Sequence, residues 1–221
     1  MTTNGTYLAE KAQQLKLAGL KRVNVNLNTL NAERYKDMTN GGDLNTILKG
    51  IEVAKQVGLT PVKINVCIMK GVNEDELMDF VNLTQNENVE VRFVEWIPEY
   101  TNHELGKQLF IANEALMKRI PGLIPVPNKD QTAAVKFFNL PESKGKIGFI
   151  SPVSQSFCGI CNCIRLTADG FLKRCLHDKE EVAIKQMLGN ERLLEHVLRR
   201  SIFQKDESCR FEDVVLESAI E

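Results

Sequence analysis

The stretch that decides the fold is Pro61-Val62-Lys63-Ile64-Asn65-Val66-Cys67-Ile68-Met69. This apolar, β-branched run is typical of a buried strand. Residues 22–27 precede it and alternate apolar and polar side chains in the same manner. Residues 89–97 follow it as a third run of this kind and end at Pro98. We therefore expect three strands in the first hundred residues.

Helical patterns lie between these strands. Residues 7–18 and 43–57 repeat apolar side chains at helical spacing and end at Gly19 and Gly58, and acidic residues open a third helix over 73–83. Strands spaced by helices predict βα units and a parallel sheet, that is, the α/β class. Three units fall short of the eight of a closed TIM-type barrel, so residues 1–100 read as a partial (β/α) barrel. Because such a barrel leaves an unpaired strand edge, we expect a further segment before residue 1 in the complete protein.

The pattern of predicted elements changes after residue 100. Residues 101–140 read as a connector with one helix over 110–120. Residues 141–221 then predict a small α+β region. Its expected strands, together with the one at 134–140 that leads into it, are 146–150, 164–167 and 171–174, with a hairpin turn at 168–170. Helices are expected over 179–188 and 191–203.

Composition excludes several classes of protein. The 221 residues are 43% apolar and 26% charged with a net charge of −1, so neither disorder nor a nucleic-acid partner is expected. No run of 18 apolar residues indicates a membrane span, and no signal or transit peptide is visible. We expect a cytoplasmic location, or the mitochondrial matrix in a eukaryote. Four of the six cysteines fall between residues 158 and 175, which in such a compartment favours metal binding over disulfides.

The cysteine spacing is the sharpest chemical signal. Cys158 and Cys161 flank two residues in a turn, and Cys175 returns after a strand–turn–strand excursion. Three thiolates suit a [4Fe–4S] cluster with one open iron, or a zinc ion completed by a fourth ligand. Cys163 adds a fourth sulfur and makes an all-cysteine zinc site equally consistent with the residues alone.

Several strings in order over residues 1–178 resemble one family. They are Thr2-Thr3-Asn4-Gly5, Leu17-Ala18-Gly19-Leu20, Pro61-Val62-Lys63-Ile64-Asn65, and the runs 92–98, 145–150 and 157–176. The family is GTP 3′,8-cyclase, the radical S-adenosylmethionine (SAM) enzyme that begins molybdenum cofactor synthesis. Its fold is an incomplete (β/α)6 barrel followed by a region that holds a second [4Fe–4S] cluster.

The resemblance implies a set of site residues. The second cluster would bind Cys158, Cys161 and Cys175, and its open iron would coordinate the guanine of GTP. The positions similar to GTP contacts are Thr2, Lys63, Arg92 and Arg165. A lysine near a strand end can pair with phosphate, which fits this role for Lys63. The family is commonly dimeric, so a homodimer is expected.

The chain also departs from the family pattern. The Cys-x3-Cys-x2-Cys motif of the first, SAM-cleaving cluster does not occur in these residues. Asn26 and Ile97 stand where the family has a serine and a methionine against SAM, and Cys163 replaces an arginine at the GTP site. We therefore expect this chain alone to lack the cyclase reaction and to need an N-terminal cluster segment. The alternative is a non-catalytic iron–sulfur or four-cysteine zinc protein descended from the family.

Overall fold

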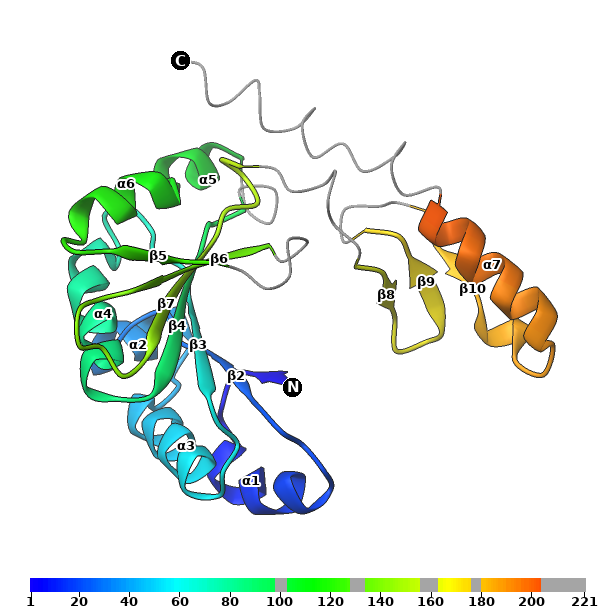
Figure 1. Cartoon of the computed structure of the whole chain (residues 1–221), viewed down its shortest axis with the longest axis horizontal. Coiled ribbons are helices and arrows are strands. Elements are labelled where there is room, and N and C mark those ends of the chain that lie inside the picture. Colours follow the sequence, from blue (N-terminus) through cyan, green and yellow to red (C-terminus); the bar gives the residue numbers. More distant parts are fainter. Residues whose placement is uncertain (98–102, 128–133, 156–162, 176–179, 204–221) are drawn as a thin grey trace. The chain divides into compact units, whose positions relative to one another are not determined.

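The computed structural model describes residues 1–97, 103–127, 134–155, 163–175 and 180–203. The chain forms two compact units (Figure 1), and each is described here by itself. The first unit comprises Met1–Lys129 and Val135–Ser154, and the second comprises Asp130–Ala134 and Gln155–Glu221.

A seven-stranded sheet with the order β1-β2-β3-β4-β7-β6-β5 forms the centre of the first unit. The first five strands in this order run parallel, and β6 and β5 are antiparallel to their neighbours. The strands are β1 (Thr2–Thr3), β2 (Asn24–Asn26), β3 (Val62–Val66), β4 (Val89–Val94), β5 (Ile124–Val126), β6 (Val135–Asn139) and β7 (Lys146–Ile150). The expected α/β class with a mainly parallel sheet is thereby confirmed.

Helices cover one face of this sheet (Figure 1). They are α1 (Leu8–Leu17), α2 (Ala32–Met38), α3 (Leu44–Gln56), α4 (Leu77–Asn86), α5 (His103–Leu109) and α6 (Asn113–Arg119), with a 3₁₀ turn η1 (Glu74–Glu76) before α4. Asp43 caps α3 by accepting hydrogen bonds from the backbone N–H groups of Asn45 and Thr46, each at 3.1 Å. The helices predicted near 7–18, 43–57, 73–83 and 110–120 are confirmed. The short helices α2 and α5 were not predicted.

The core lies between these helices and the sheet. Alternate residues of the strands, such as Val25, Ile64 and Val91, are 2% exposed or less and belong to one cluster with the inner faces of α1, α3 and α4. Phe93 stacks on Phe149 with ring centroids 5.5 Å apart. Burial of this apolar face stabilises the fold at roughly 25 cal/mol per Å².

The strand β7 belongs to this first sheet, although it was expected in a separate region beginning at residue 141. It pairs with β4, and Ile147 and Phe149 are buried in the first unit's core. Gly145 makes this approach feasible, because a Cβ atom there would lie 2.1 Å from the carbonyl oxygen of Val89. The units consequently divide after Ser154.

The second unit contains a small antiparallel sheet with the order β10-β9-β8. Its elements are β8 (Arg165–Leu166), β9 (Phe171–Lys173), β10 (Val182–Ala183), a 3₁₀ turn η4 (Lys185–Met187) and α7 (Glu191–Phe203). The predicted hairpin and the last helix are confirmed. The helix predicted over 179–188 is wrong, because Val182 pairs with Leu172 and the N–H groups of Ile184 and Lys185 both donate to the carbonyl of Gly170. Contacts with the hairpin here override local helical spacing.

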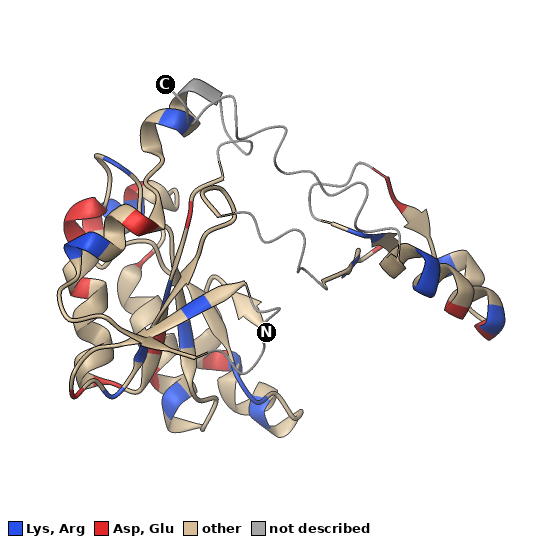
Figure 2. Cartoon of the chain, turned by 45° about the horizontal axis from the view of Figure 1, so that its top comes forward, with Lys and Arg blue, Asp and Glu red and all other residues tan. Residues whose placement is uncertain are grey.

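Acidic and basic residues are interspersed over the first unit (Figure 2), in keeping with the near-neutral net charge. Among the described residues, no helix has the length and apolar content needed to cross a membrane.

Candidate anion site and cysteine hairpin

Two rows of mostly polar residues cross the sheet face that the helices leave uncovered. Both rows run over β2, β3, β4 and β7, because strand register places one residue of each strand side by side. The first row is Asn24, Lys63, Glu90 and Lys146. The second row, two residues further along each strand, is Asn26, Asn65, Arg92 and Gly148. Side chains alternate along a strand, so these rows point away from the apolar core.

Three charged residues form a partly buried cluster within these rows. The side chains of Lys63, Glu90 and Arg92 are 14%, 11% and 16% exposed. Arg92 Nε donates to Glu90 Oε1, and Lys63 Nζ lies 3.7 Å from the same oxygen. Two cations therefore share one carboxylate, which leaves the cluster with a net charge of about +1 at neutral pH.

The guanidinium of Arg92 is also fixed by its neighbours. Its central carbon lies 5.7 Å from the ring centroid of Phe137 on β6, within range of a cation–π contact. Gly148 leaves room for this arrangement, since a Cβ atom there would lie 3.3 Å from both Arg92 Cγ and the Phe137 ring. Arg92 is thus positioned before any ligand arrives.

Burial changes the acid–base behaviour of Lys63. Loss of solvent lowers the pKa of this ammonium below its ordinary value, the carboxylate of Glu90 raises it, and the nearby cations Arg92 and Arg22 lower it further. The net effect on the pKa is a decrease. A lysine that is poorly hydrated and has cationic neighbours gains from a bound anion.

Amides extend the site toward β1. Asn65 Nδ2 donates to Asn26 Oδ1 at 3.0 Å, while Asn65 Oδ1 is buried without a hydrogen-bond partner among the described residues. Asn24 Nδ2 donates to Thr2 Oγ1 at 3.3 Å. Of the residues predicted to contact GTP, Thr2, Lys63 and Arg92 therefore lie on β1, β3 and β4 of one sheet. Arg165 lies in the second unit, where it is exposed on β8.

Glu95, just after β4, is a buried carboxylate that sequence reasoning missed. It is 3% exposed and accepts hydrogen bonds from the N–H groups of Asn113, Val153 and Ser154 at 2.9, 3.0 and 2.9 Å, and from the Ser154 hydroxyl. The sequence signal that could have identified Glu95 is an acidic residue within the otherwise strand-like run 89–97. The Glu95 carboxylate joins the ends of β4 and β7 to the start of α6.

Ile97, which the sequence placed at a SAM contact, lies two residues after Glu95 and is half-buried.

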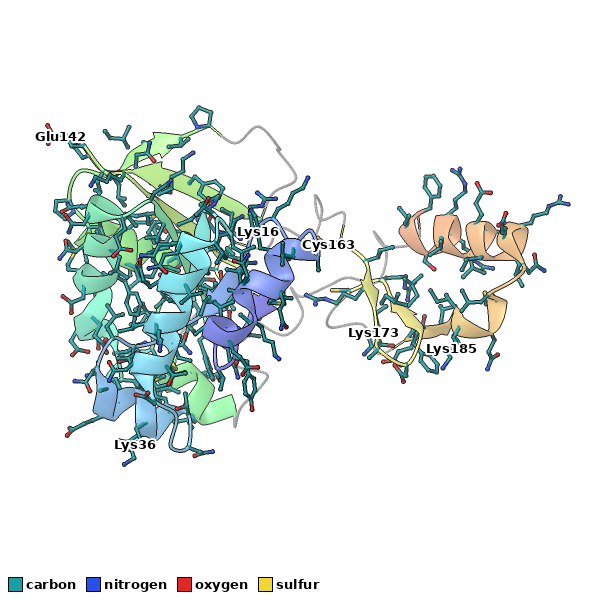
Figure 3. The ribbon with its side chains drawn as sticks, turned by 90° about the horizontal axis from the view of Figure 1, so that it is seen from below. Lys16, Lys36, Glu142, Cys163, Lys173 and Lys185 are labelled. Carbon is teal, nitrogen blue, oxygen red and sulfur yellow. The ribbon has the colours of Figure 1, made fainter. Side chains whose placement is uncertain are left out.

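The described cysteines of the second unit flank the hairpin in sequence, Cys163 before β8 and Cys175 after β9. Cys163 is exposed and Cys175 is half-buried, and neither forms a disulfide (Figure 3 labels Cys163). Because β8 and β9 pair with Arg165 opposite Lys173, Cys163 and Cys175 come to the same open end of the hairpin. Cys158 and Cys161 lie outside the described residues. Within the described ranges, no group of three metal-ligating side chains is assembled.

Cys67 follows β3 and is half-buried, and its surroundings disfavour the reactive thiolate. Burial raises the pKa of its thiol to about 12, and the charge of Glu95 adds to this rise. We therefore expect native protein treated with iodoacetamide at pH 8 to keep Cys67 unmodified, because only the thiolate reacts. Mass spectrometry of the peptide would show this. The same protein in urea should be alkylated there, and equal labelling in both states would contradict the burial.

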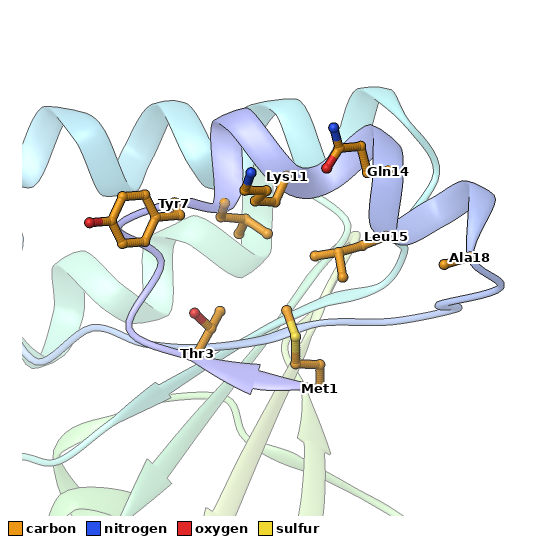
Figure 4. A pocket seen from close by; sticks show the side chains of 8 residues that line it. Met1, Thr3, Tyr7, Lys11, Gln14, Leu15 and Ala18 are labelled. Carbon is orange, nitrogen blue, oxygen red and sulfur yellow. The ribbon is translucent and has the colours of Figure 1, made fainter.

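A pocket of about 400 Å³ lies elsewhere, between β1 and α1 (Figure 4). Its lining is mostly apolar and comprises Met1, Thr3, Tyr7, Leu8, Lys11, Gln14, Leu15 and Ala18. It contains neither Lys63 nor Arg92, so it offers no paired cations and is not the candidate site.

The mainly parallel sheet, whose uncovered face carries Lys63 and Arg92, is consistent with the class that comparison of sequences gives. Residues 1–84 match the Radical SAM superfamily. Residues 89–211 match Molybdenum Cofactor Synthesis C, and the chain belongs to this family. Relatives named GTP 3',8-cyclase come from Clostridium botulinum (strain Hall), with 43% identity, and Alkaliphilus oremlandii, with 42% identity. These matches cover 93% and 94% of this chain. The chain spans 64% and 65% of the length of these relatives.

Proposed function

We propose that this chain binds GTP and an iron–sulfur cluster as part of a GTP 3′,8-cyclase of molybdenum cofactor biosynthesis. The observation that carries the proposal is the pair of partly buried cations, Lys63 and Arg92, on the inner face of a radical-SAM-type sheet. The relatives that match almost the whole chain bear the name of this activity. We further propose that the sheet forms part of an incomplete barrel.

The residues of the site fit a nucleoside triphosphate. Lys63 and Arg92 offer charge-assisted hydrogen bonds to phosphate oxygens, and the hydroxyl of Thr2 adds a neutral donor on the next strand but one. The Asn65 oxygen supplies a buried acceptor that has no partner among the described residues. Arg165, on β8, stays a prediction from the family resemblance.

The cysteines fit a cluster by the chemistry of their donor atoms. Cys158, Cys161 and Cys175 would hold it, and Cys175 follows β9 at the open end of the hairpin. When bound, a cluster on three thiolates supplies an iron able to coordinate the base of the nucleotide.

The residues at the SAM positions fit that cofactor poorly. The side-chain oxygen of Asn26 already accepts a hydrogen bond from Asn65 Nδ2, and Ile97 has no sulfur. These 221 residues also contain no Cys-x3-Cys-x2-Cys motif. We therefore propose no SAM-dependent step for them.

Calorimetric titration with GTP tests the nucleotide assignment. Lys63→Met and Arg92→Met should each weaken binding about 10-fold or more, since a hydrogen bond to a charged group is worth about 1.5–3 kcal/mol. Lys36→Met, on the exposed surface of α2, is the matched control and should bind as the parent does. Unchanged affinity in both site variants would refute the proposal.

A second candidate is a four-cysteine zinc protein without cyclase activity. The observation in its favour is the hairpin register, which brings Cys163 to the same end as Cys175. Metal analysis separates the two candidates, as argued in the Discussion.

A further inference from the structure

We propose that Glu90 is a built-in counter-ion that competes with ligand phosphates for Lys63 and Arg92, and thereby makes the site selective for phosphate chains over single anions. The inference rests on the proposed function, because it concerns the same site. It assigns a role to a residue that would otherwise seem out of place beside an anionic ligand.

The geometry places this carboxylate between the two cations. Glu90 is buried and comes from β4, in register with Lys63 on β3. Its Oε1 atom accepts from Arg92 Nε and lies 3.7 Å from Lys63 Nζ. The same carboxylate oxygen therefore accepts from Arg92 Nε and lies within ion-pair range of Lys63.

Competition follows from the charges. An incoming anion must draw Lys63 and Arg92 away from Glu90 or accept a like charge a few ångströms away, and partial burial strengthens that repulsion. A single anion gains little, because it replaces a carboxylate that the fold already holds in place. A phosphate chain brings several charges and more acceptor oxygens, and can contact both cations at once.

The register adds a further cation. Lys146 on β7 is the neighbour of Glu90 in the first row and is exposed on the same face. A chain that reaches past Glu90 could contact Lys146, whereas a single phosphate held at Lys63 could not do both. The position of Lys146 therefore favours ligands that are longer as well as more highly charged.

The test compares the parent protein with Glu90→Gln, using inorganic triphosphate, inorganic phosphate and GTP in calorimetric titrations. We expect Glu90→Gln to bind triphosphate about 10-fold more tightly, and its affinity for phosphate to rise by a larger factor. Glu87→Gln is the matched control, because it removes a carboxylate that pairs with Lys55 away from the two rows, and it should behave as the parent does. Equal or weaker triphosphate binding by Glu90→Gln would overturn the inference.

A second variant tests whether the loss of the negative charge, rather than a change in folding, causes the effect. Glu90→Asp keeps the charge and should retain the parent's affinities, so a gain as large as that of Glu90→Gln would also overturn the inference. Thermal unfolding gives an independent readout, since triphosphate should raise the melting temperature of Glu90→Gln more than that of the parent. A smaller rise in the melting temperature of Glu90→Gln than in that of the parent would contradict the inference.

The outcomes separate this inference from the proposed function. If neither protein binds GTP but Glu90→Gln gains triphosphate, the counter-ion role stands and the nucleotide assignment fails. If both proteins bind GTP and triphosphate equally well, the nucleotide assignment stands and the counter-ion role fails.

Discussion

Cys175→Ser is expected to lose nearly all bound iron and sulfide after anaerobic reconstitution, whereas the parent protein should hold about four atoms of each per chain. A serine hydroxyl is a poor substitute for a thiolate ligand, and a cluster held by three cysteines has none to spare. Iron and acid-labile sulfide analysis, with the visible absorption spectrum, would measure the loss.

Two further serine variants make this result specific. Cys209→Ser is the matched control, because Cys209 belongs to no cysteine spacing pattern, and it should retain the cluster. Cys163→Ser separates the candidate sites: it should keep iron and sulfide if three cysteines hold a cluster, and should lose metal if four cysteines hold zinc. One tightly bound zinc with no sulfide in the parent would reject the cluster.

The sequence was sufficient to predict elements whose apolar spacing matches their burial. The strand at 62–66 alternates buried and half-buried residues, and α3 buries the face marked by Leu44, Ile47 and Ile51. It failed for residues 182–187, where a helical pattern gives way to pairing with the hairpin. Local spacing cannot report a partner that the chain meets only after folding.

The site was predictable only in part, for the same reason. Lys63 and Arg92 could be identified from the strings around them, but their sharing of Glu90 depends on the register of β3 against β4. The placement of β7 beside β4 likewise depends on Gly145 and on the contact between Phe93 and Phe149. Neither the strand register nor the placement of β7 can be predicted from the spacing of residues along the chain.

Glu95→Ala is expected to lower the free energy of unfolding of the first unit by about 3 kcal/mol or more. The substitution leaves the N–H groups of Asn113, Val153 and Ser154 without their acceptor in a buried place, and each unsatisfied donor costs about 1–3 kcal/mol. Trp96 is the only tryptophan and lies next to Glu95, so its fluorescence during urea unfolding reports on this unit. The free energy follows from the midpoint and slope.

The comparison with Glu114→Ala decides whether the carboxylate or merely a charge is responsible. Glu114 lies in the first turn of α6, beside Asn113, and pairs with Lys118 on the surface, so its loss should cost about 1 kcal/mol or less. Glu95→Gln should fall between the two variants, because its amide keeps one acceptor oxygen but turns an NH₂ group toward backbone donors. A Glu95→Ala protein as stable as Glu114→Ala would mean that the junction of β4, β7 and α6 is held by packing alone.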